Sequence, residues 1–428
     1  MSAGLTLDGL FRRAGVRNAH ATALADPPHR ATFTDGARRR LTYAQADRAI
    51  SAFAATLRGL GLHTGTIVGL QLPNTVESVI AFLGTVRAGM VAAPLPVLWR
   101  RQDMVEALGR AGARAIVTAA RIGETRHAEL AMEVAAELFP IRQICAFGAD
   151  LPDGVVPLDG VFAGGAADTP PQRLGDVSAQ VVAMTFDMSA DGIVAVAHDH
   201  AHLLEAGVAL AEAAGLALDT PIVTTIPLSS FAGLTASLMP WLITGGELSL
   251  HHGFDADAFA GQTAALEHGA VVLPGPVVAA LADAVAATNR IVALWRAPLG
   301  PAARTPVANI ADCVARDETS VTVATRGVDG LPDPTIVEAA ARIAAPGTVA
   351  VGAYKFRQAA LDTAVAAFDP AAMIAALPDA LLGNRLAGHA PEAARIAADL
   401  AAHGANPLVA QAFRRGRSLN SEASSTRY

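Results

Sequence analysis

The segment of residues 67–95 constrains the fold more than any other part of the chain. It contains a short apolar run at 67–72, a helical pattern from about 76 to 88, and a second apolar run at 89–95. Two short strands joined by a helix form a parallel, right-handed unit whose helices cover the sheet. The sequence therefore predicts an α/β fold of the wound type.

The same alternation continues along the first three-fifths of the chain. Further helices are expected at 103–111, 129–138, 200–214 and 232–243, and further strands at 115–118, near 144, at 181–186 and at 222–226. From 296 to 346 the pattern becomes short and proline-rich. We expect a large α/β domain over 1–330, with subdomains of about 1–170 and 171–330. A small α+β domain over 347–417 and a frayed tail over 418–428 are expected to follow.

Composition excludes several classes of protein. The chain has 428 residues, 52% of them hydrophobic, and a net charge of −7, which argues against disorder and against nucleic-acid binding. Its two cysteines have no paired spacing and predict reduced core thiols, so we expect a cytoplasmic protein. The uncharged stretch 220–246 is interrupted by prolines and glycines, and no membrane span is predicted.

Positive charge is distributed unusually. Lys355 is the single lysine, and residues 174–289 contain neither Lys nor Arg. The same stretch holds twelve acidic residues, a formal charge of −12. Such a segment is a poor place to hold a triphosphate.

Several short motifs occur in a characteristic order. They are Leu41-Thr42-Tyr43, Gly59-Leu60-Gly61 with Gly65, 68–74, 87–89, 93–96, Pro227-Leu228, Gly233-Leu234, Pro240, Leu242, Gly245-Gly246, 352–356, Pro378-Asp379 and 382–385. This set resembles the adenylate-forming (AMP-binding) acyl-CoA synthetase/ligase superfamily, of which the chain looks like a divergent and shortened member. The resemblance covers roughly two-thirds of the chain. It implies a large wound α/β N-terminal domain of the adenylate-forming type plus a small α+β C-terminal domain.

The resemblance also implies a chemistry, in which a carboxylic acid reacts with ATP to give an acyl-adenylate and the acyl group usually passes to coenzyme A. The family's phosphate loop combines small residues with a lysine, because backbone N–H groups and an ammonium hold the phosphates. The corresponding segment here is 185–198, where Thr185, Ser189 and Gly192 are the matching loop residues. The lysine is absent, and Asp187 and Asp191 would repel phosphate.

Other parts of the nucleotide site are also missing. The family's Tyr-Gly-x-Thr-Glu segment, whose Glu holds magnesium, is not found, and no lysine follows Lys355. Arg342 is the one match to the family's hinge Arg. Each lost electrostatic donor commonly costs about two to three orders of magnitude in rate, so the resemblance predicts a degenerate ATP site.

Four residues are candidates for a substrate pocket. Ser229 and Ser230 stand where the family often has a His near the acyl pocket, and they also suit helix capping. Gly233 belongs to the same segment. Lys355 matches a turn near the family's acyl-transfer site, although a structural or surface role is the more ordinary interpretation.

Three histidines, His198, His200 and His202, alternate like positions on one face of a strand, and such a set could bind zinc. A histidine pair followed by a helix start is ordinary in this family, so no metal site is predicted. The sequence assigns no catalytic residue.

Two functions remain open at this point. The first is an acyl-CoA ligase-like pseudoenzyme that binds an acyl compound, an acyl-CoA or a protein partner, with weak or no adenylation and no certain cofactor. The alternative is an active acid–thiol ligase using ATP, magnesium and coenzyme A, in which Arg290, Arg296, Arg304 or Arg342 reaches the phosphates. An ATP-independent acyl transferase or hydrolase has no Ser/His/Asp spacing to support it.

Overall fold

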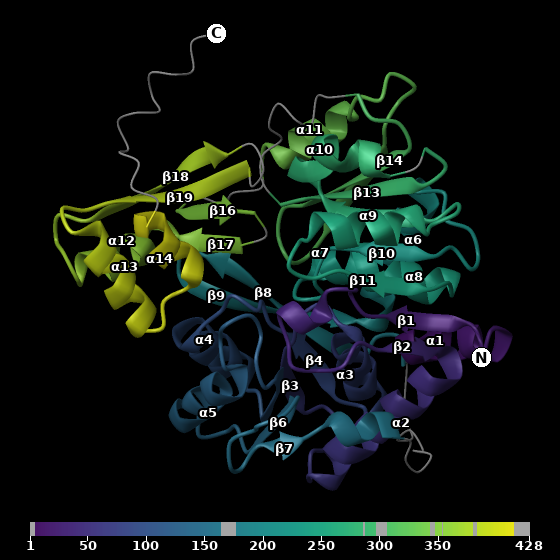
Figure 1. Cartoon of the computed structure of the whole chain (residues 1–428), viewed down its shortest axis with the longest axis horizontal. Helices are drawn as coiled ribbons and strands as arrows, with labels where there is room; N and C mark the ends of the chain where they lie inside the picture. Colours follow the sequence, from purple (N-terminus) through teal and green to yellow (C-terminus); the bar gives the residue numbers. More distant parts are fainter. Residues whose placement is uncertain are drawn as a thin grey trace.

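A computed structural model describes residues 5–163, 177–285, 287–296, 306–342, 347–352, 354–379 and 383–414. Two large sheets with covering helices lie beside a smaller unit of hairpins and helices (Figure 1). The predicted fold class, a wound α/β domain with a small α+β domain, is confirmed. Among the described residues, no helix combines the length and apolar composition that crossing a bilayer requires.

The first sheet has seven strands in the order β7-β6-β5-β3-β4-β8-β9. Its strands are β3 (Ile67–Gln71), β4 (Val91–Pro94), β5 (Ala115–Ala119), β6 (Gln143–Phe147), β7 (Val156–Pro157), β8 (Val181–Ser189) and β9 (Gly192–Asp199). All neighbours are parallel except β8 and β9. The connecting helices are α3 (Val76–Arg87), α4 (Arg101–Ala111) and α5 (His127–Glu137). The strand–helix–strand prediction for residues 67–95 is correct.

The second sheet has eight strands in the order β15-β14-β13-β12-β10-β11-β1-β2. Its strands are β1 (Thr22–Ala25), β2 (Arg40–Thr42), β10 (Ile222–Thr224), β11 (Leu248–Leu250), β12 (Ala270–Pro274), β13 (Arg290–Trp295), β14 (Ile310–Ala315) and β15 (Val321–Thr325). The inner strands are parallel, and the two edge strands β15 and β2 pair antiparallel. Its helices include α6 (His200–Ala213), α7 (Phe231–Gly233), α8 (Met239–Thr244), α9 (Ala256–Ala264), α10 (Val278–Leu281) and α11 (Pro334–Ala340).

Each of the two large sheets contains strands from both sides of the subdomain boundary expected near residue 170. The N-terminal strand β1 pairs with β11 of the second sheet and β2 pairs with β1, whereas β8 and β9 complete the first sheet. A β-strand finds its partner by long-range pairing, which local patterns do not encode. These strand pairings connect the two halves of the large domain.

Helix α3 lies in the core that the two sheets share. All of its residues, Val76–Arg87, are buried, as expected for a helix that is apolar around most of its circumference. Neighbouring helix α2 (Tyr43–Gly59) begins at the capping box of Thr42 and Gln45, in which each side chain bonds the other residue's backbone N–H. Helix α1 (Leu7–Arg17) adds Phe11 to the same apolar core.

The C-terminal residues form a smaller unit with its own apolar core. It contains the hairpins β16 (Thr348–Val351) with β17 (Tyr354–Arg357) and β18 (Met373–Asp379) with β19 (Gly383–His389), covered by α12 (Gln358–Ala366), α13 (Ala393–Ala402) and α14 (Pro407–Arg414). Phe356, Leu361, Ile396 and Phe413 pack in its core. Strand β17 lies against β8 of the large domain (Figure 1), which brings Tyr354 and Lys355 to the site described next.

Candidate functional site

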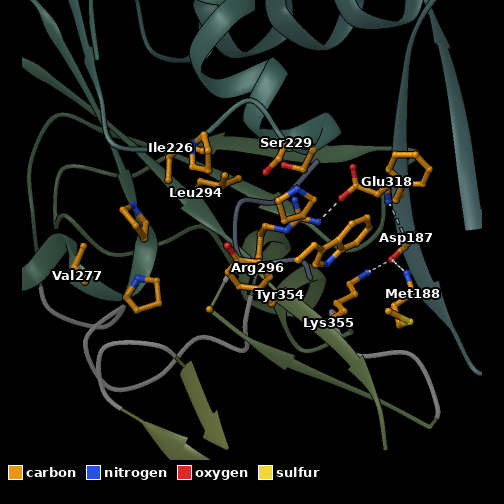
Figure 2. Close-up of a pocket in the computed structure, with 18 residues that line it drawn as sticks. Asp187, Met188, Ile226, Ser229, Val277, Leu294, Arg296, Glu318, Tyr354 and Lys355 are labelled. Atoms are coloured by element: carbon orange, nitrogen blue, oxygen red, sulfur yellow. Dashed lines mark hydrogen bonds and ion pairs between the residues drawn. The ribbon is translucent and has the colours of Figure 1, made fainter. Parts of the chain in front are cut away.

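A cavity of about 210 Å³ lies between the two large sheets and the C-terminal unit (Figure 2). Its lining residues are Pro96, Trp99, Phe186, Asp187, Met188, Ile226, Pro227, Ser229, Ser230, Pro274, Pro276, Val277, Leu294, Arg296, Glu318, Gly352, Tyr354 and Lys355. Ile226, Pro274, Arg296 and Glu318 follow or end the parallel strands β10, β12, β13 and β14. Ligands of open α/β sheets commonly bind beyond the carboxyl ends of such strands.

Most of the wall is apolar. Trp99 and Phe186 pack with ring centroids 5.7 Å apart, and four prolines and several aliphatic side chains complete the surface. The phenol of Tyr354 is hydrogen-bonded to the backbone of Leu98, and burial raises its pKa. A cavity of this kind favours apolar and aromatic groups.

The first ion pair of the cavity joins Lys355 and Asp187. Nζ of Lys355 lies 2.8 Å from Oδ1 of Asp187 and donates a second hydrogen bond to the carbonyl oxygen of Arg316 at 2.8 Å. The backbone N–H of Met188 also donates to Oδ1 of Asp187. The side chains are only 9% and 17% exposed, so this pair is largely withdrawn from water.

The second ion pair joins Arg296 and Glu318. Nη2 of Arg296 donates to Oε1 of Glu318, and the backbone N–H of Phe231 donates to Oε2 at 2.6 Å. The Glu318 side chain is 1% exposed and that of Arg296 10% exposed. A buried carboxylate needs such partners, because leaving it unpaired costs several kcal/mol.

The two ion pairs are connected. The backbone N–H of Glu318 donates to Oδ2 of Asp187 at 3.1 Å. Each of the two cations that line the cavity, Arg296 and Lys355, is therefore matched by a carboxylate of the same cavity, and the formal charge of the described lining is zero. A nucleotide would find no unmatched cation among the described lining residues.

The segment that corresponds to the phosphate loop is a tight hairpin. Strands β8 and β9 pair from Val181 and Asp199 up to Ser189 and Gly192, so only two residues form the turn. The Ser189 hydroxyl donates to the Gly192 carbonyl oxygen at 3.0 Å, and the N–H of Asp191 donates to that hydroxyl. Backbone groups that could cradle phosphates are thus committed to the strand pairing and the turn.

The predicted nucleotide residues do not converge on the cavity. Thr185 is fully buried and hydrogen-bonded to His198, and Gly192 lies against Glu106 with a φ of 124°. Arg342 is exposed just after α11 and pairs with Glu338. Ser189 ends β8 beside the hairpin turn, so the described residues that match the family's nucleotide site do not fit ATP and magnesium.

The predicted substrate-pocket residues are divided. Ser229, Ser230 and Lys355 line the cavity, whereas Gly233 lies within the helix start behind it. Ser230 is also the N-cap of α7, since its hydroxyl accepts a hydrogen bond from the N–H of Gly233 at 3.0 Å. A methyl group at Gly233 would overlap the carbonyl oxygen of Pro227.

Glu318 is the charged residue of the described cavity lining that sequence reasoning missed. It follows the buried parallel strand β14 by three residues. An acidic residue just beyond such a strand was the sequence signal that could have identified it as a site residue. Asp187, which the sequence marks as a carboxylate that would repel phosphate, is largely buried on β8 and paired with Lys355. Of the arginines considered for phosphate binding, only Arg296 lines the cavity. Arg290 bonds Asn309, and Arg304 lies outside the described residues.

The three clustered histidines do not alternate on one strand, so that interpretation is wrong. Only His198 lies on β9, because α6 begins at His200. His200 accepts a hydrogen bond from Leu7 N–H, and no group of three potential metal ligands occurs in the described part of the chain. The helix begins at His200 because the Asp199 side chain caps it by accepting a hydrogen bond from the N–H of His202.

His198 and His202 instead form a hydrogen-bonded relay. His202 Nε2 donates to the Thr319 carbonyl oxygen at 2.8 Å, so its Nδ1 accepts from Nδ1–H of His198 at 3.3 Å. His198 Nε2 then accepts from the Thr185 hydroxyl at 2.7 Å. Burial lowers the pKa of His198 to about 4, which keeps the ring neutral. The relay therefore anchors Thr319, the residue that follows Glu318.

Comparison with known proteins supports the resemblance and limits it. Residues 11–154 match the family model "AMP-binding enzyme". The chain is 26% identical over 117 residues to the medium-chain fatty-acid–CoA ligase of Escherichia coli K12, covering 27% of this chain and 21% of that protein. It is 34% identical over 115 residues to human long-chain fatty acid transport protein 1, covering 27% and 17%. The matched segment thus spans about a fifth or less of these relatives.

Solved structures match a larger share of the chain. An anthranilate CoA ligase in complex with anthranoyl-AMP aligns over 91% of this chain and 87% of its own, with a TM-score of 0.64 and 14% identity. A benzoate CoA ligase from Burkholderia xenovorans LB400 aligns over 73% and 61%, with a TM-score of 0.58 and 19% identity. At such identities the likeness shows a shared fold.

Proposed function

We propose that this chain, which resembles AMP-binding enzymes over residues 11–154 and has the fold of the adenylate-forming superfamily, is a ligand-binding pseudoenzyme. In this proposal it binds an acyl compound in the cavity behind Trp99 and Phe186, with weak or no adenylation. A protein partner and a cytoplasmic location belong to the same proposal.

The observation that carries the proposal is the pairing of both cavity cations. Adenylation needs positive charge directed at the phosphates as negative charge develops on them. Lys355 and Arg296 are the described cations of the cavity, and Asp187 and Glu318 neutralise them. Opening either pair to admit phosphate would leave a largely buried carboxylate without its partner, which is unfavourable.

The hairpin of β8 and β9 supports the same conclusion independently. A phosphate loop presents several free N–H groups to the ligand. Here the N–H of Ile193 donates to Glu106 Oε1 at 2.9 Å, and that of Asp191 donates to Ser189. The chain segment that would hold the β- and γ-phosphates is thus engaged with protein groups.

The test is calorimetric titration with magnesium-ATP, followed by pyrophosphate exchange with benzoate, anthranilate and a medium-chain fatty acid. We expect no binding heat up to millimolar nucleotide and no exchange above the protein-free rate. An active acyl-CoA ligase assayed in parallel establishes the sensitivity. Micromolar nucleotide binding, or acid-dependent exchange, would overturn the proposal.

The second candidate function is an active ligase, and one specific observation favours it. Glu318, Arg296 and Lys355 supply an acid and two cations to a single cavity, which is the charge set that adenylation uses. In this alternative the protein would require ATP, magnesium and coenzyme A, and both ion pairs would have to open. The exchange assay distinguishes the two candidates directly.

A further inference from the structure

We infer that the cavity selects an uncharged acyl compound, such as an amide, ester or thioester, over a free carboxylate. The inference rests on the proposed function, because it assigns the ligand class of the same cavity. It follows from the charge balance of the wall, the hydrogen-bond donors that remain, and the size of the space.

The charge balance disfavours an incoming carboxylate. Glu318 already occupies Nη2 of Arg296, and Asp187 already occupies Nζ of Lys355. A ligand carboxylate beside Arg296 would lie next to the carboxylate of Glu318, which is 1% exposed. Beside Lys355 it would lie next to that of Asp187, which is 17% exposed. Like charges at short range repel strongly where the charged side chains are largely buried. A free acid would therefore be desolvated without a full counter-charge.

The remaining donors suit a carbonyl oxygen. In the described contacts of Arg296, Nη2 donates to Glu318, whose carboxylate balances the guanidinium charge. The Nε–H and Nη1–H groups are then available to donate to a ligand. Ser229, whose hydroxyl can donate a hydrogen bond, lines the same cavity. A carbonyl oxygen can accept a hydrogen bond from such groups without adding charge, so an amide or ester gains polar contacts that an apolar molecule lacks.

The size of the cavity limits the ligand. Its volume of about 210 Å³ is below the roughly 300–1,000 Å³ typical of sites for drug-sized molecules. The rings of Trp99 and Phe186 and the walls of Pro96 and Pro274 offer flat apolar surfaces. A single aromatic ring or a short acyl chain with one carbonyl group fits this description.

The experiment compares two pairs of probes that differ in charge but hardly in shape. Benzamide and benzoate, and 3-phenylpropionamide and 3-phenylpropionate, are titrated into the full chain at neutral pH and followed by calorimetry or ligand-observed NMR. We expect each amide to bind at least tenfold more tightly than its acid, a difference of about 1.4 kcal/mol. Equal or tighter binding of the acids, or no binding of any probe at millimolar concentration, would overturn the inference.

A substitution in the wall makes the test sharper. Glu318→Gln keeps an oxygen for the N–H of Phe231 but removes the charge that neutralises Arg296. We expect benzoate binding to strengthen by roughly tenfold or more in this variant, while benzamide binding changes less than about threefold. The matched control is Glu247→Gln, which removes an acid paired with Arg40 outside the cavity and should change neither affinity.

A second variant keeps the test valid if Glu318→Gln does not fold. Asp187→Asn frees Lys355 in the same way and should also shift the preference towards benzoate. If neither variant changes the ratio of the two affinities, the inference is wrong. Its failure is distinguishable from failure of the proposed function, because an acid-preferring protein that neither binds ATP nor exchanges pyrophosphate would contradict the inference alone.

Discussion

Nζ of Lys355 lies 2.8 Å from Oδ1 of Asp187, so the single lysine of the chain joins the C-terminal unit to the segment that corresponds to the phosphate loop. Lys355 is on β17 and Asp187 is on β8. The contact places a carboxylate where the superfamily resemblance predicts phosphate binding, and it uses the ammonium to neutralise that carboxylate. This interaction links the small unit to the large domain at the wall of the cavity (Figure 2).

The reactivity of Lys355 tests this pairing directly, because it carries the only side-chain amine of the protein. Its side chain is 9% exposed and donates to Asp187 and to the Arg316 carbonyl oxygen. We expect an N-hydroxysuccinimide ester to acetylate Lys355 at least about tenfold more slowly in the folded protein than in urea, since access and rotation are restricted. Mass spectrometry of the peptide that contains residue 355 gives the rate.

Asp187→Asn should raise the labelling rate of Lys355 several-fold in the folded protein. The control is Asp219→Asn, which removes a half-exposed partner of Arg17 and should leave the rate unchanged. Labelling of Lys355 as fast in the folded wild-type protein as in urea would show that the pair does not persist in solution.

Ser230 and Gly233 make different contributions to the start of α7, and their substitutions separate packing from capping. Gly233→Ala should destabilise the fold by about 2–4 kcal/mol, because the added methyl overlaps the Pro227 carbonyl oxygen and the surrounding segment is buried. Ser230→Ala removes the cap and should cost about 1 kcal/mol. Urea unfolding midpoints compare them, and equal midpoints for Gly233→Ala and wild type would contradict the packing described here.

The elements that depend on neighbouring residues could be predicted from sequence. The strand and helix of residues 67–88 were predictable because their periodicity and their apolar runs are local, and the capping residues Thr42 and Gln45 mark the start of α2. The resemblance predicts a substrate pocket that contains Ser229, Ser230, Gly233 and Lys355. In the structure Gly233 does not line the cavity, whereas the other three residues do.

Features that depend on distant parts of the chain were not predictable in the same way. The pair of Arg296 and Glu318 joins the ends of β13 and β14, and only the parallel register of those strands brings the residues together. The insertion of β1 beside β11 depends on long-range strand pairing. The spacing of His198 and His202 suits both a strand and a helix start, and the cap formed by Asp199 determines that a helix begins at His200.

Neutral buried histidines should make stability fall in mild acid. Burial lowers the folded pKa of His198 from 6.5 to about 4, so between these pH values the unfolded chain binds a proton that the folded chain does not. Stability is therefore constant above about pH 6.5 and decreases towards pH 4 by about 1.4 kcal/mol per pH unit for this group. Burial also lowers the pKa of His252, to about 4, and that of His127, to about 3.

His198→Gln tests the contribution of one ring. Glutamine can accept from the Thr185 hydroxyl but does not titrate, so the slope of unfolding free energy against pH should decrease by about 1.4 kcal/mol per pH unit between 6.5 and 4. Burial raises the pKa of Asp26 and Asp103 to about 6, so these two groups increase the unfolding free energy as the pH falls below that value. They do so equally in the wild type and in the variant. Urea unfolding over this range gives the slopes. Identical slopes would show that His198 titrates normally when folded.

Arg30 is enclosed by two carboxylates and should be among the most sensitive charged residues of the core. Its side chain is 3% exposed and pairs with Asp26, which is fully buried, and with Glu77, which lies 2.7 Å away. Arg30→Met leaves both carboxylates in the core with less compensation, so we expect a loss of about 3–5 kcal/mol at neutral pH. By contrast, Arg12→Met removes an exposed partner of Asp8 and should cost less than about 1 kcal/mol.

The pH dependence of Arg30→Met identifies the cause of that loss. Burial, followed by the nearby Glu77, raises the pKa of Asp26 from 3.8 to about 6, whereas Arg30 lowers it. Removing Arg30 should raise this folded pKa further, so the folded variant takes up a proton at a higher pH than the wild type does. A folded pKa above the unfolded value makes protonation stabilising as pH falls through it. The deficit of the variant relative to wild type should therefore shrink from pH 7.5 to about pH 5.5, and a deficit that stays constant in urea unfolding over this range would assign the loss to packing alone.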